Sequence, residues 1–198
     1  MNVLPVASAK PKLLTATDWA AASQELKVET AALRAVADVE SAGEAFFMNG
    51  RPKILFEAHV FSRLTHHLYD VSHPHISSLK WNRALYKGGE REYDRLTAAM
   101  ALNPSAACES ASWGRFQIMG FHWRLCGYKT VFDFVSAQFA SELEQLDCFM
   151  SYLSANRLTR HLQSKNWAAF ALGYNGSGYK ANKYDTKLEA AYNRRKSA

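Results

Sequence analysis

The sequence has few cysteines and no long hydrophobic run. Although 48% of its 198 residues are hydrophobic, no stretch reaches the roughly 18 uninterrupted apolar residues that a membrane span needs. The segment Met1–Val6 lacks a basic region followed by an apolar run, so we expect no signal peptide. These absences predict a protein that does not insert stably into a membrane. If it acts outside the cytoplasm, another factor has to deliver it.

The three cysteines, Cys108, Cys126 and Cys148, cannot all pair with one another. None belongs to a Cys-x-x-Cys pair, and no His–Cys spacing is typical of a structural zinc site. We interpret them as buried thiols in a reducing compartment, with a catalytic cysteine as the alternative. We predict no metal and no cofactor.

The formal net charge of +6 favours an anionic partner, which can be nucleic acid or a cell wall. Basic residues are scattered along the sequence, and the one short run is Arg194–Lys196. There is no alternation of basic and aromatic residues and no nucleic-acid motif. We therefore expect no nucleic-acid partner.

The pattern of the chain is predominantly helical, with one β-hairpin signal, which predicts the α+β class. Residues 1–14 are interpreted as a flexible N-terminal arm, and residues 15–198 as one folded domain. Asn49-Gly50 predicts a hairpin before a short strand at 53–56. A long loop is expected at 70–89. Helices are expected at 19–26 after N-cap signals at 15–18, at 29–42 with a stop at Gly43, and at 57–69, 90–102, 132–155, 167–172 and 187–194.

Glu40 lies near the end of the predicted helix 29–42. Leu33, Val36 and Ala37 share a helix face with it, and this face is expected to be buried. Desolvation favours the neutral carboxyl, and the negative end of the helix dipole acts in the same direction, so both raise its pKa. A raised pKa suits a general acid at neutral pH. The position alone also fits a glutamate whose carboxyl reaches solvent.

Two further segments carry small polar, amide and aromatic side chains. In Ser110–Gly120, Ser112 and Gln117 are candidate hydrogen-bond donors of a cleft wall, which Gly114 lets a ligand approach closely. In a purely structural segment, the amide of Gln117 would need a buried partner. The second segment ends a helix in a glycine-rich turn and offers an aromatic and an amide side chain, which suit a pyranose; a plain helix cap is the alternative. Its two candidates are Tyr174 and Asn175.

The order of these motifs resembles that of goose-type lysozymes and lytic transglycosylases: Glu40-Ser41, Trp113-Gly114 with Phe116–Met119, and Tyr174–Gly176. The fuller similarity is to the N-acetylmuramidase domain of phage endolysins, which has similar stretches at Gly50–Glu57, Ala111–Gly114 and Tyr184–Leu188. The resemblance extends over about residues 15–195, and several motifs in one order make it specific.

The resemblance implies a lysozyme-like fold with a small β-hairpin, and an N-acetylmuramidase catalytic domain over residues 15–198. It implies cleavage of the β-1,4 bond between N-acetylmuramic acid and N-acetylglucosamine in bacterial peptidoglycan. It assigns the acid to Glu40 and suggests substrate contacts from Gln117, Tyr174 and Asn175, to which Ser112 is added from the residue types above.

Glu57 is the candidate second carboxylate. A muramidase that delivers water needs a base or an electrostatic stabiliser facing the acid across the sugar. Glu57 follows the predicted hairpin, and the alternative is a salt bridge with Arg51 or Lys53. Glu109 is interpreted as solvated surface. The five histidines His59, His66, His67, His73 and His75 are interpreted as surface or packed groups rather than metal ligands.

The sequence therefore predicts a peptidoglycan hydrolase of the muramidase type that acts by general acid catalysis. The alternatives are a lytic transglycosylase, which forms 1,6-anhydro products with one carboxylate, and a non-catalytic wall-binding protein. We expect a monomer that stays in the host cytoplasm until its release, as in an endolysin, and then acts on cell-wall peptidoglycan.

Overall fold

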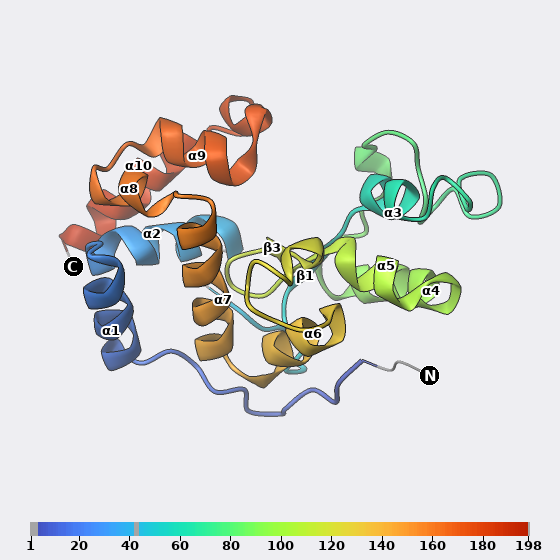
Figure 1. Ribbon diagram of the computed structural model, residues 1–198, viewed down its shortest axis with the longest axis horizontal. Coiled ribbons are helices and arrows are strands. Elements are labelled where there is room, and N and C mark those ends of the chain that lie inside the picture. The colour runs from blue at the N-terminus through green and yellow to red at the C-terminus, as the bar shows by residue number, and fades with distance from the viewer. Residues whose placement is uncertain (1–3, 42–43, 198) are drawn as a thin grey trace.

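The computed structural model describes residues 4–41 and 44–197. Figure 1 shows two groups of helices, one on each side of a small central sheet. The first contains α1, α2 and α7–α10, and the second contains α3–α5. The α-helices are α1 (Ala16–Leu26), α2 (Thr30–Ser41), α3 (Ala58–Leu64), α4 (Glu92–Leu102), α5 (Pro104–Glu109), α6 (Val131–Ala140), α7 (Glu142–Ala155), α8 (Thr159–Gln163), α9 (Trp167–Asn175) and α10 (Tyr184–Lys196). The strands and 3-10 helices are β1 (Ile54–Phe56), β2 (Ala111–Trp113), β3 (Ile118–Met119), η1 (Arg83–Leu85), η2 (Gly89–Arg91), η3 (Gly120–His122) and η4 (Ser177–Lys180). The predicted α+β class with mainly helices is confirmed.

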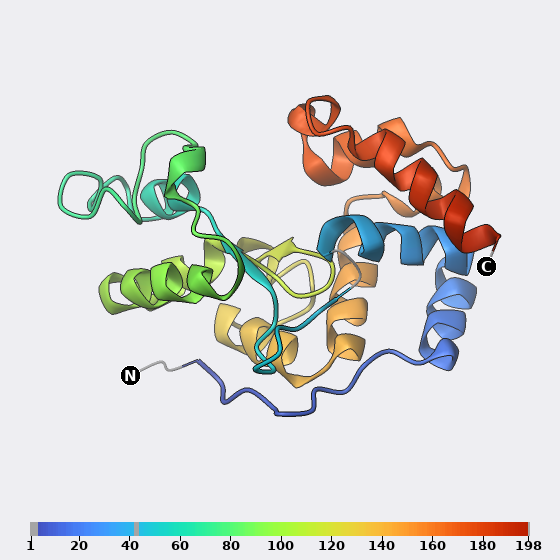
Figure 2. The same cartoon turned by 180° about the vertical axis from the view of Figure 1, so that it is seen from behind.

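The first two helices begin and pack as the sequence predicts. A capping box precedes α1, since the Thr15 side chain accepts from the backbone of Asp18 while the Asp18 carboxylate accepts from the backbone of Thr15. Helix α2 buries its apolar face, and α10 packs across it (Figure 2). The stop predicted at Gly43 lies outside the described residues.

The sheet has the order β1-β2-β3, and both strand pairs are antiparallel. The strand predicted before residue 57 is confirmed as β1, whereas β2 and β3 were not predicted. The Asn49-Gly50 turn is present and is closed by an isolated bridge between Phe46 and Pro52. A Cβ on Gly50 would lie 1.8 Å from the carbonyl oxygen of Ser8, so the N-terminal segment packs against this turn.

Residues 4–14 run in extended form towards α1 along the lower edge of the molecule in Figure 1. The backbone of Glu142 donates to the carbonyl of Lys12 at 2.9 Å, and the backbone of Leu14 donates to the Glu142 carboxylate at 2.7 Å. These contacts tie the end of the segment to the start of α7. The flexibility predicted for residues 1–14 stays a prediction.

The single helix predicted over residues 132–155 is wrong. Ser141 adopts an extended backbone, with φ −166° and ψ 164°, and separates α6 from α7. Its hydroxyl accepts from the backbone of Glu144 and caps α7. The apolar spacing continues across the break because both helices face the same core. The predicted helix 57–69 is also too long, because α3 ends at Leu64.

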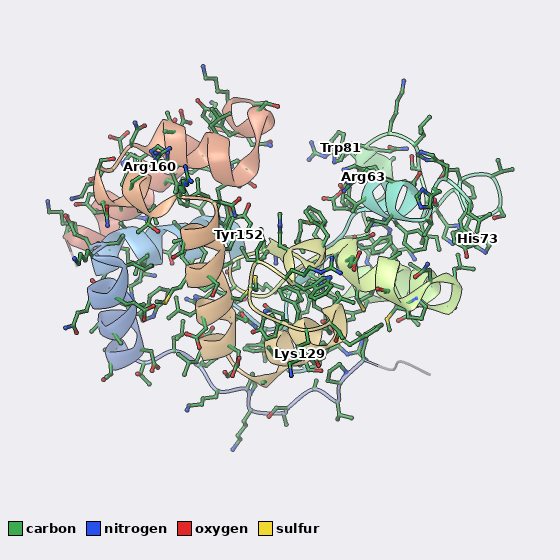
Figure 3. The ribbon with its side chains drawn as sticks, viewed as in Figure 1. Arg63, His73, Trp81, Lys129, Tyr152 and Arg160 are labelled. Atoms are coloured by element: carbon green, nitrogen blue, oxygen red, sulfur yellow. The ribbon has the colours of Figure 1, made fainter. Side chains whose placement is uncertain are left out.

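The long loop after α3 contains two 3-10 helices, as the prediction of a long connection allows. Its end is fixed to α4, because the buried Glu92 carboxylate accepts from the backbones of Lys87 and Gly88 at 2.6 and 2.9 Å. Arg95 pairs with the same carboxylate at 2.7 Å. Figure 3 shows Trp81 of this loop on the side of the α3–α5 group, and Tyr152 of α7 on the side of the other group of helices.

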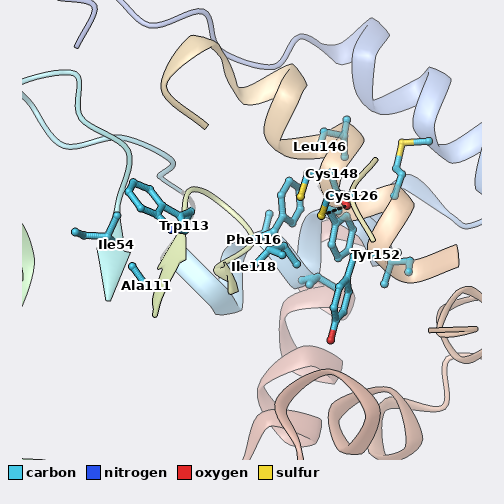
Figure 4. Close-up of a cluster of buried hydrophobic side chains, with 14 of the residues drawn as sticks. Ile54, Ala111, Trp113, Phe116, Ile118, Cys126, Leu146, Cys148 and Tyr152 are labelled. Carbon is cyan, nitrogen blue, oxygen red and sulfur yellow. Dashed lines mark hydrogen bonds between the residues drawn. The ribbon is translucent and has the colours of Figure 1, made fainter. Parts of the chain in front are cut away.

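The core lies where the sheet meets α7 (Figure 4). Phe116 stacks on Phe149, with ring centroids 4.2 Å apart. All three cysteines are free and buried, as predicted. Burial raises the pKa of the Cys108 thiol to about 12, so at neutral pH it lacks the thiolate that a catalytic cysteine needs.

Candidate active site

Glu40 lies in the last turn of α2, next to the end of α9. The Asn175 side-chain amide donates to its Oε1 at 2.9 Å. The Glu40 side chain keeps some surface in contact with solvent. The carboxyl group is nevertheless largely surrounded by protein, which removes most of its contact with water.

Burial raises the pKa of Glu40 to about 7, and it outweighs the bond from Asn175 and the charge of Lys187, which both lower the pKa. The carboxyl is therefore close to half protonated at neutral pH. A carboxylic acid in this state can donate a proton to a leaving oxygen.

Asn175 has a second polar atom that matters for the same carboxyl. Its Oδ1 is buried and has no hydrogen-bond partner among the described residues. If the amide turns over, Oδ1 can accept the proton of a neutral Glu40, whereas Nδ2 donates to an ionised one. Asn175 can thus orient both protonation states.

Tyr174 connects α9 to the turn between β2 and β3. Its hydroxyl donates to the carbonyl of Phe116 at 2.7 Å, and its ring stacks on Phe170 with centroids 5.2 Å apart. The ring edge of Tyr152 faces it at 5.5 Å. These contacts hold the end of α9, and with it Asn175, against the sheet.

A pocket of about 330 Å³ opens between the β3–η3 segment and the end of α9. This volume is in the range of small-ligand sites. Predicted site residues from two motifs meet there, since Gln117, Tyr174 and Asn175 line it, and Asn175 connects it to Glu40. The complete lining is Gln117, Ile118, Met119, Phe121, His122, Tyr152, Gly173, Tyr174, Asn175 and Gly176.

Ser112 and Gln117 bond to each other within the turn that joins β2 to β3. The Ser112 hydroxyl donates to Oε1 of Gln117 at 2.8 Å. Nε2 of Gln117 donates to the carbonyls of Gly114 and Lys53 at 2.8 and 3.3 Å. The side-chain amide of Gln117 therefore has hydrogen-bond partners within the protein, as expected for a structural residue. The predicted sugar contacts of both residues stay a prediction.

Gly114 does provide close approach, but to a side chain of the protein. Its φ is +68°, and a Cβ there would lie 2.5 Å from Cδ of Gln145 and 2.9 Å from Oε1 of Gln138. This packing accounts for the glycine, and the approach of a ligand at Gly114 stays a prediction. The glycine lets the β2–β3 turn pack on α6 and α7.

Glu57 is held by two residues of its own helix group. The Tyr86 hydroxyl donates to Glu57 Oε2, and Nδ1 of His59 lies 3.2 Å from the same oxygen. The salt bridge considered with Arg51 or Lys53 is not formed, because Lys53 pairs with Glu44 and Arg51 lies over the Tyr93 ring. No hydrogen bond links Glu57 to Glu40 in the part of the chain that the structure describes.

Tyr86, His59 and Trp81 were not recognised from the sequence as parts of the site. Trp81 is 61% exposed, and its ring centroid lies 6.2 Å from that of Tyr86. It therefore offers an aromatic surface near Glu57. Tyr86 and Trp81 lie in a loop whose path has no periodic pattern, so no local signal marks them.

The remaining candidates are placed away from these contacts. Glu109 accepts from the Trp123 indole at 3.1 Å. His67 and Ser77 bond to Asp70 in the loop. Within residues 4–41 and 44–197 no group of three His, Cys, Asp or Glu side chains is arranged to hold a metal ion. No helix in the same ranges is long and apolar enough to cross a membrane.

The chain is similar to known proteins in sequence and in fold. The family model of N-acetylmuramidases matches residues 29–196. The fold is similar to the crystal structure of the Burkholderia AP3 phage endolysin, with a TM-score of 0.85 and 43% sequence identity. That match covers 95% of this chain and 72% of the endolysin chain. The comparison with curated proteins finds no match.

Proposed function

The chain belongs to the N-acetylmuramidase family, and from this premise we propose that it cleaves the β-1,4 bond between N-acetylmuramic acid and N-acetylglucosamine. Its family makes it a peptidoglycan hydrolase. The structural relative is a phage endolysin, so the proposed role is lysis of the bacterial cell wall when phage particles are released. Residues 15–198 form the catalytic domain in this proposal, and the protein acts as a monomer.

The observation that carries the proposal is the environment of Glu40. A glycosidic oxygen leaves as an alcohol only if it receives a proton, and at neutral pH an ordinary glutamate has already lost its own. Burial raises the pKa of Glu40 to about 7, so this glutamate keeps part of its protons at neutral pH. In the proposal Glu40 donates its proton to the leaving oxygen, and Asn175 keeps the carboxyl oriented.

Glu57 is the proposed second carboxylate. It accepts a hydrogen bond from Tyr86, so its oxygen is held in one place. In this role it activates a water or stabilises the positive charge that develops on the sugar ring. Trp81 and the lining of the pocket at Asn175 are the proposed contacts of the glycan strand.

Hydrolysis is favoured over the intramolecular route because the protein builds a support for Glu57. A lytic transglycosylase needs no second carboxylate, since a hydroxyl of the muramic acid attacks instead of water. A carboxylate fixed by a tyrosine from a loop that is itself anchored to α4 is the feature expected of the hydrolytic route.

The variant Glu40→Gln tests the acid. The amide has nearly the same shape but no proton to donate, so turnover of purified peptidoglycan should fall by two to four orders of magnitude, about what acid catalysis contributes. Binding to peptidoglycan and the far-UV circular dichroism spectrum should be unchanged. The matched control is Glu25→Gln, an exposed glutamate on α1, which should keep wild-type turnover. A Glu40→Gln enzyme with more than about a tenth of wild-type activity excludes the assignment.

A further inference from the structure

The formal charge is divided unevenly along the chain. Nine of the 24 Lys and Arg residues, but two of the 18 Asp and Glu residues, lie in residues 157–198. This part therefore carries +7, while residues 1–156 carry −1. The basic residues are scattered within this part of the sequence, but α8, α9 and α10 form one group of helices in space (Figure 1). The positive charge is therefore concentrated on one side of the molecule. The same group supplies Asn175 to the site.

Three of these cations belong to α10 or to its N-cap. Lys183 is the N-cap residue, with a left-handed backbone. Lys187 and Arg194 lie on the helix seven residues apart, which is about two turns. All three are exposed. None takes part in an ion pair with another described residue, whereas the adjacent Arg195 is committed to Asp38 at 2.7 Å. We call Lys183, Lys187 and Arg194 the α10 stripe.

The α10 stripe passes close to the candidate acid. Helix α10 packs on α2, which ends next to Glu40 (Figure 2). The charge of Lys187 is near enough to lower the pKa of the Glu40 carboxyl. Arg194 lies about 10 Å farther along the helix axis at 1.5 Å per residue. A long ligand seated at Glu40 and continuing along α10 would therefore meet one cation after another.

We infer that the α10 stripe binds the carboxylates of the peptidoglycan strand, and that it makes the protein prefer anionic, peptide-bearing strands to an uncharged glycan. The N-acetylated sugars offer these cations no negative charge, but the stem peptides carry free carboxylates, and so does the lactyl group of a muramic acid that bears no peptide. Exposed cations attract them without a large desolvation cost, and the attraction is weakened by salt. The inference rests on the proposed function, because it requires the strand to be seated at Glu40.

The test uses the double variant Lys183→Gln/Arg194→Gln in a Glu40→Gln background, so that the strand is not cut. Lys187 stays in place so that the surroundings of residue 40 are the same in the double variant and its parent. Binding is measured by co-sedimentation with native peptidoglycan, and with peptidoglycan whose carboxylates have been converted to methylamides. Two exposed charges predict about two- to thirtyfold weaker binding to the native polymer at low salt. Binding to the methylamide form should be equal for the double variant and its parent.

The matched control is Lys129→Gln/Arg160→Gln in the same background. It removes the same charge from two exposed residues that are not on α10 (Figure 3), and its affinity should stay within about twofold of the parent. An equal loss in this control, or a loss that persists on the methylamide polymer, overturns the inference. Failure of the proposed function is seen separately, as a wild-type protein that releases no fragments from native peptidoglycan.

Discussion

At the scale of single residues, the state of Glu40 depends on its surroundings more than on its place in a helix. The helix end was visible in the sequence, but the bond from Asn175 joins residues 135 positions apart. The sequence placed Asn175 at the site through the family resemblance, and the effect of Lys187 could not be foreseen because it depends on how α10 packs. Desolvation dominates because the carboxyl is surrounded by protein.

The raised pKa of Glu40 predicts a dependence of stability on pH. The folded protein holds this proton up to about pH 7, whereas the unfolded chain releases it near 4.5. The free energy of unfolding therefore has its full Glu40 contribution below pH 4.5 and loses it as the pH rises through 7. In Glu40→Gln this loss is absent, so the variant should gain on the order of 1–3 kcal/mol relative to wild type between pH 4.5 and 8. Denaturant melts at both pH values measure it, and an equal difference at the two contradicts the assigned pKa.

Asn175 and Gln117 should respond differently to alanine. Asn175→Ala removes the amide that orients the Glu40 carboxyl, so turnover should fall. It also removes a donor that favours the charged form of Glu40, so the alkaline limb of the pH–rate profile should move to higher pH. Gln117→Ala removes bonds inside the β2–β3 turn, so it should cost about 1–3 kcal/mol of stability. Urea melts and pH–rate profiles of both variants are the measurement. A profile of Asn175→Ala that does not move means that Asn175 has no part in tuning the acid.

At the scale of elements, the sequence predicted the positions of most helices, but it did not predict where some of them end or where two of the strands lie. The spacing of apolar residues predicted α1, α2 and α10, because each buries one face. It failed at Ser141, where the core-facing pattern runs on through a backbone break. It also gave no sign of β2 and β3, since strands of two or three residues are too short for alternation to be visible.

The loop before α4 provides an element-scale prediction about the second carboxylate. Tyr86→Phe removes the hydroxyl that donates to Glu57, and hydrogen bonds to charged groups contribute about 1.5–3 kcal/mol. If Glu57 takes part in catalysis, kcat should fall by about tenfold or more, with little change in binding to peptidoglycan. Tyr69→Phe is the matched control, since its hydroxyl bonds to the Leu102 carbonyl in the same helix group. Equal kcat values for Tyr86→Phe and wild type would show that the Tyr86 hydrogen bond to Glu57 has no part in catalysis.

At the scale of the whole molecule, the two proposed catalytic carboxylates come from different groups of helices. Glu40 comes from α2 in one group, and Glu57 begins α3 in the other, with the sheet between them (Figure 1). No local pattern could show this arrangement, because it depends on how distant segments pack. The family resemblance supplied it in outline, while the support from Tyr86 and the charge on α10 became visible in the structure alone.

The chemistry of the new chain ends distinguishes hydrolysis of the proposed bond from the other routes. Purified peptidoglycan is digested, half of the products are reduced with borohydride, and both halves are analysed by mass spectrometry. Hydrolysis of the proposed bond gives muropeptides that end in a reducing N-acetylmuramic acid and gain two hydrogens on reduction. Products that are lighter by one water and do not react would show an anhydro end and the intramolecular route. Reducing N-acetylglucosamine ends would contradict the proposed bond itself.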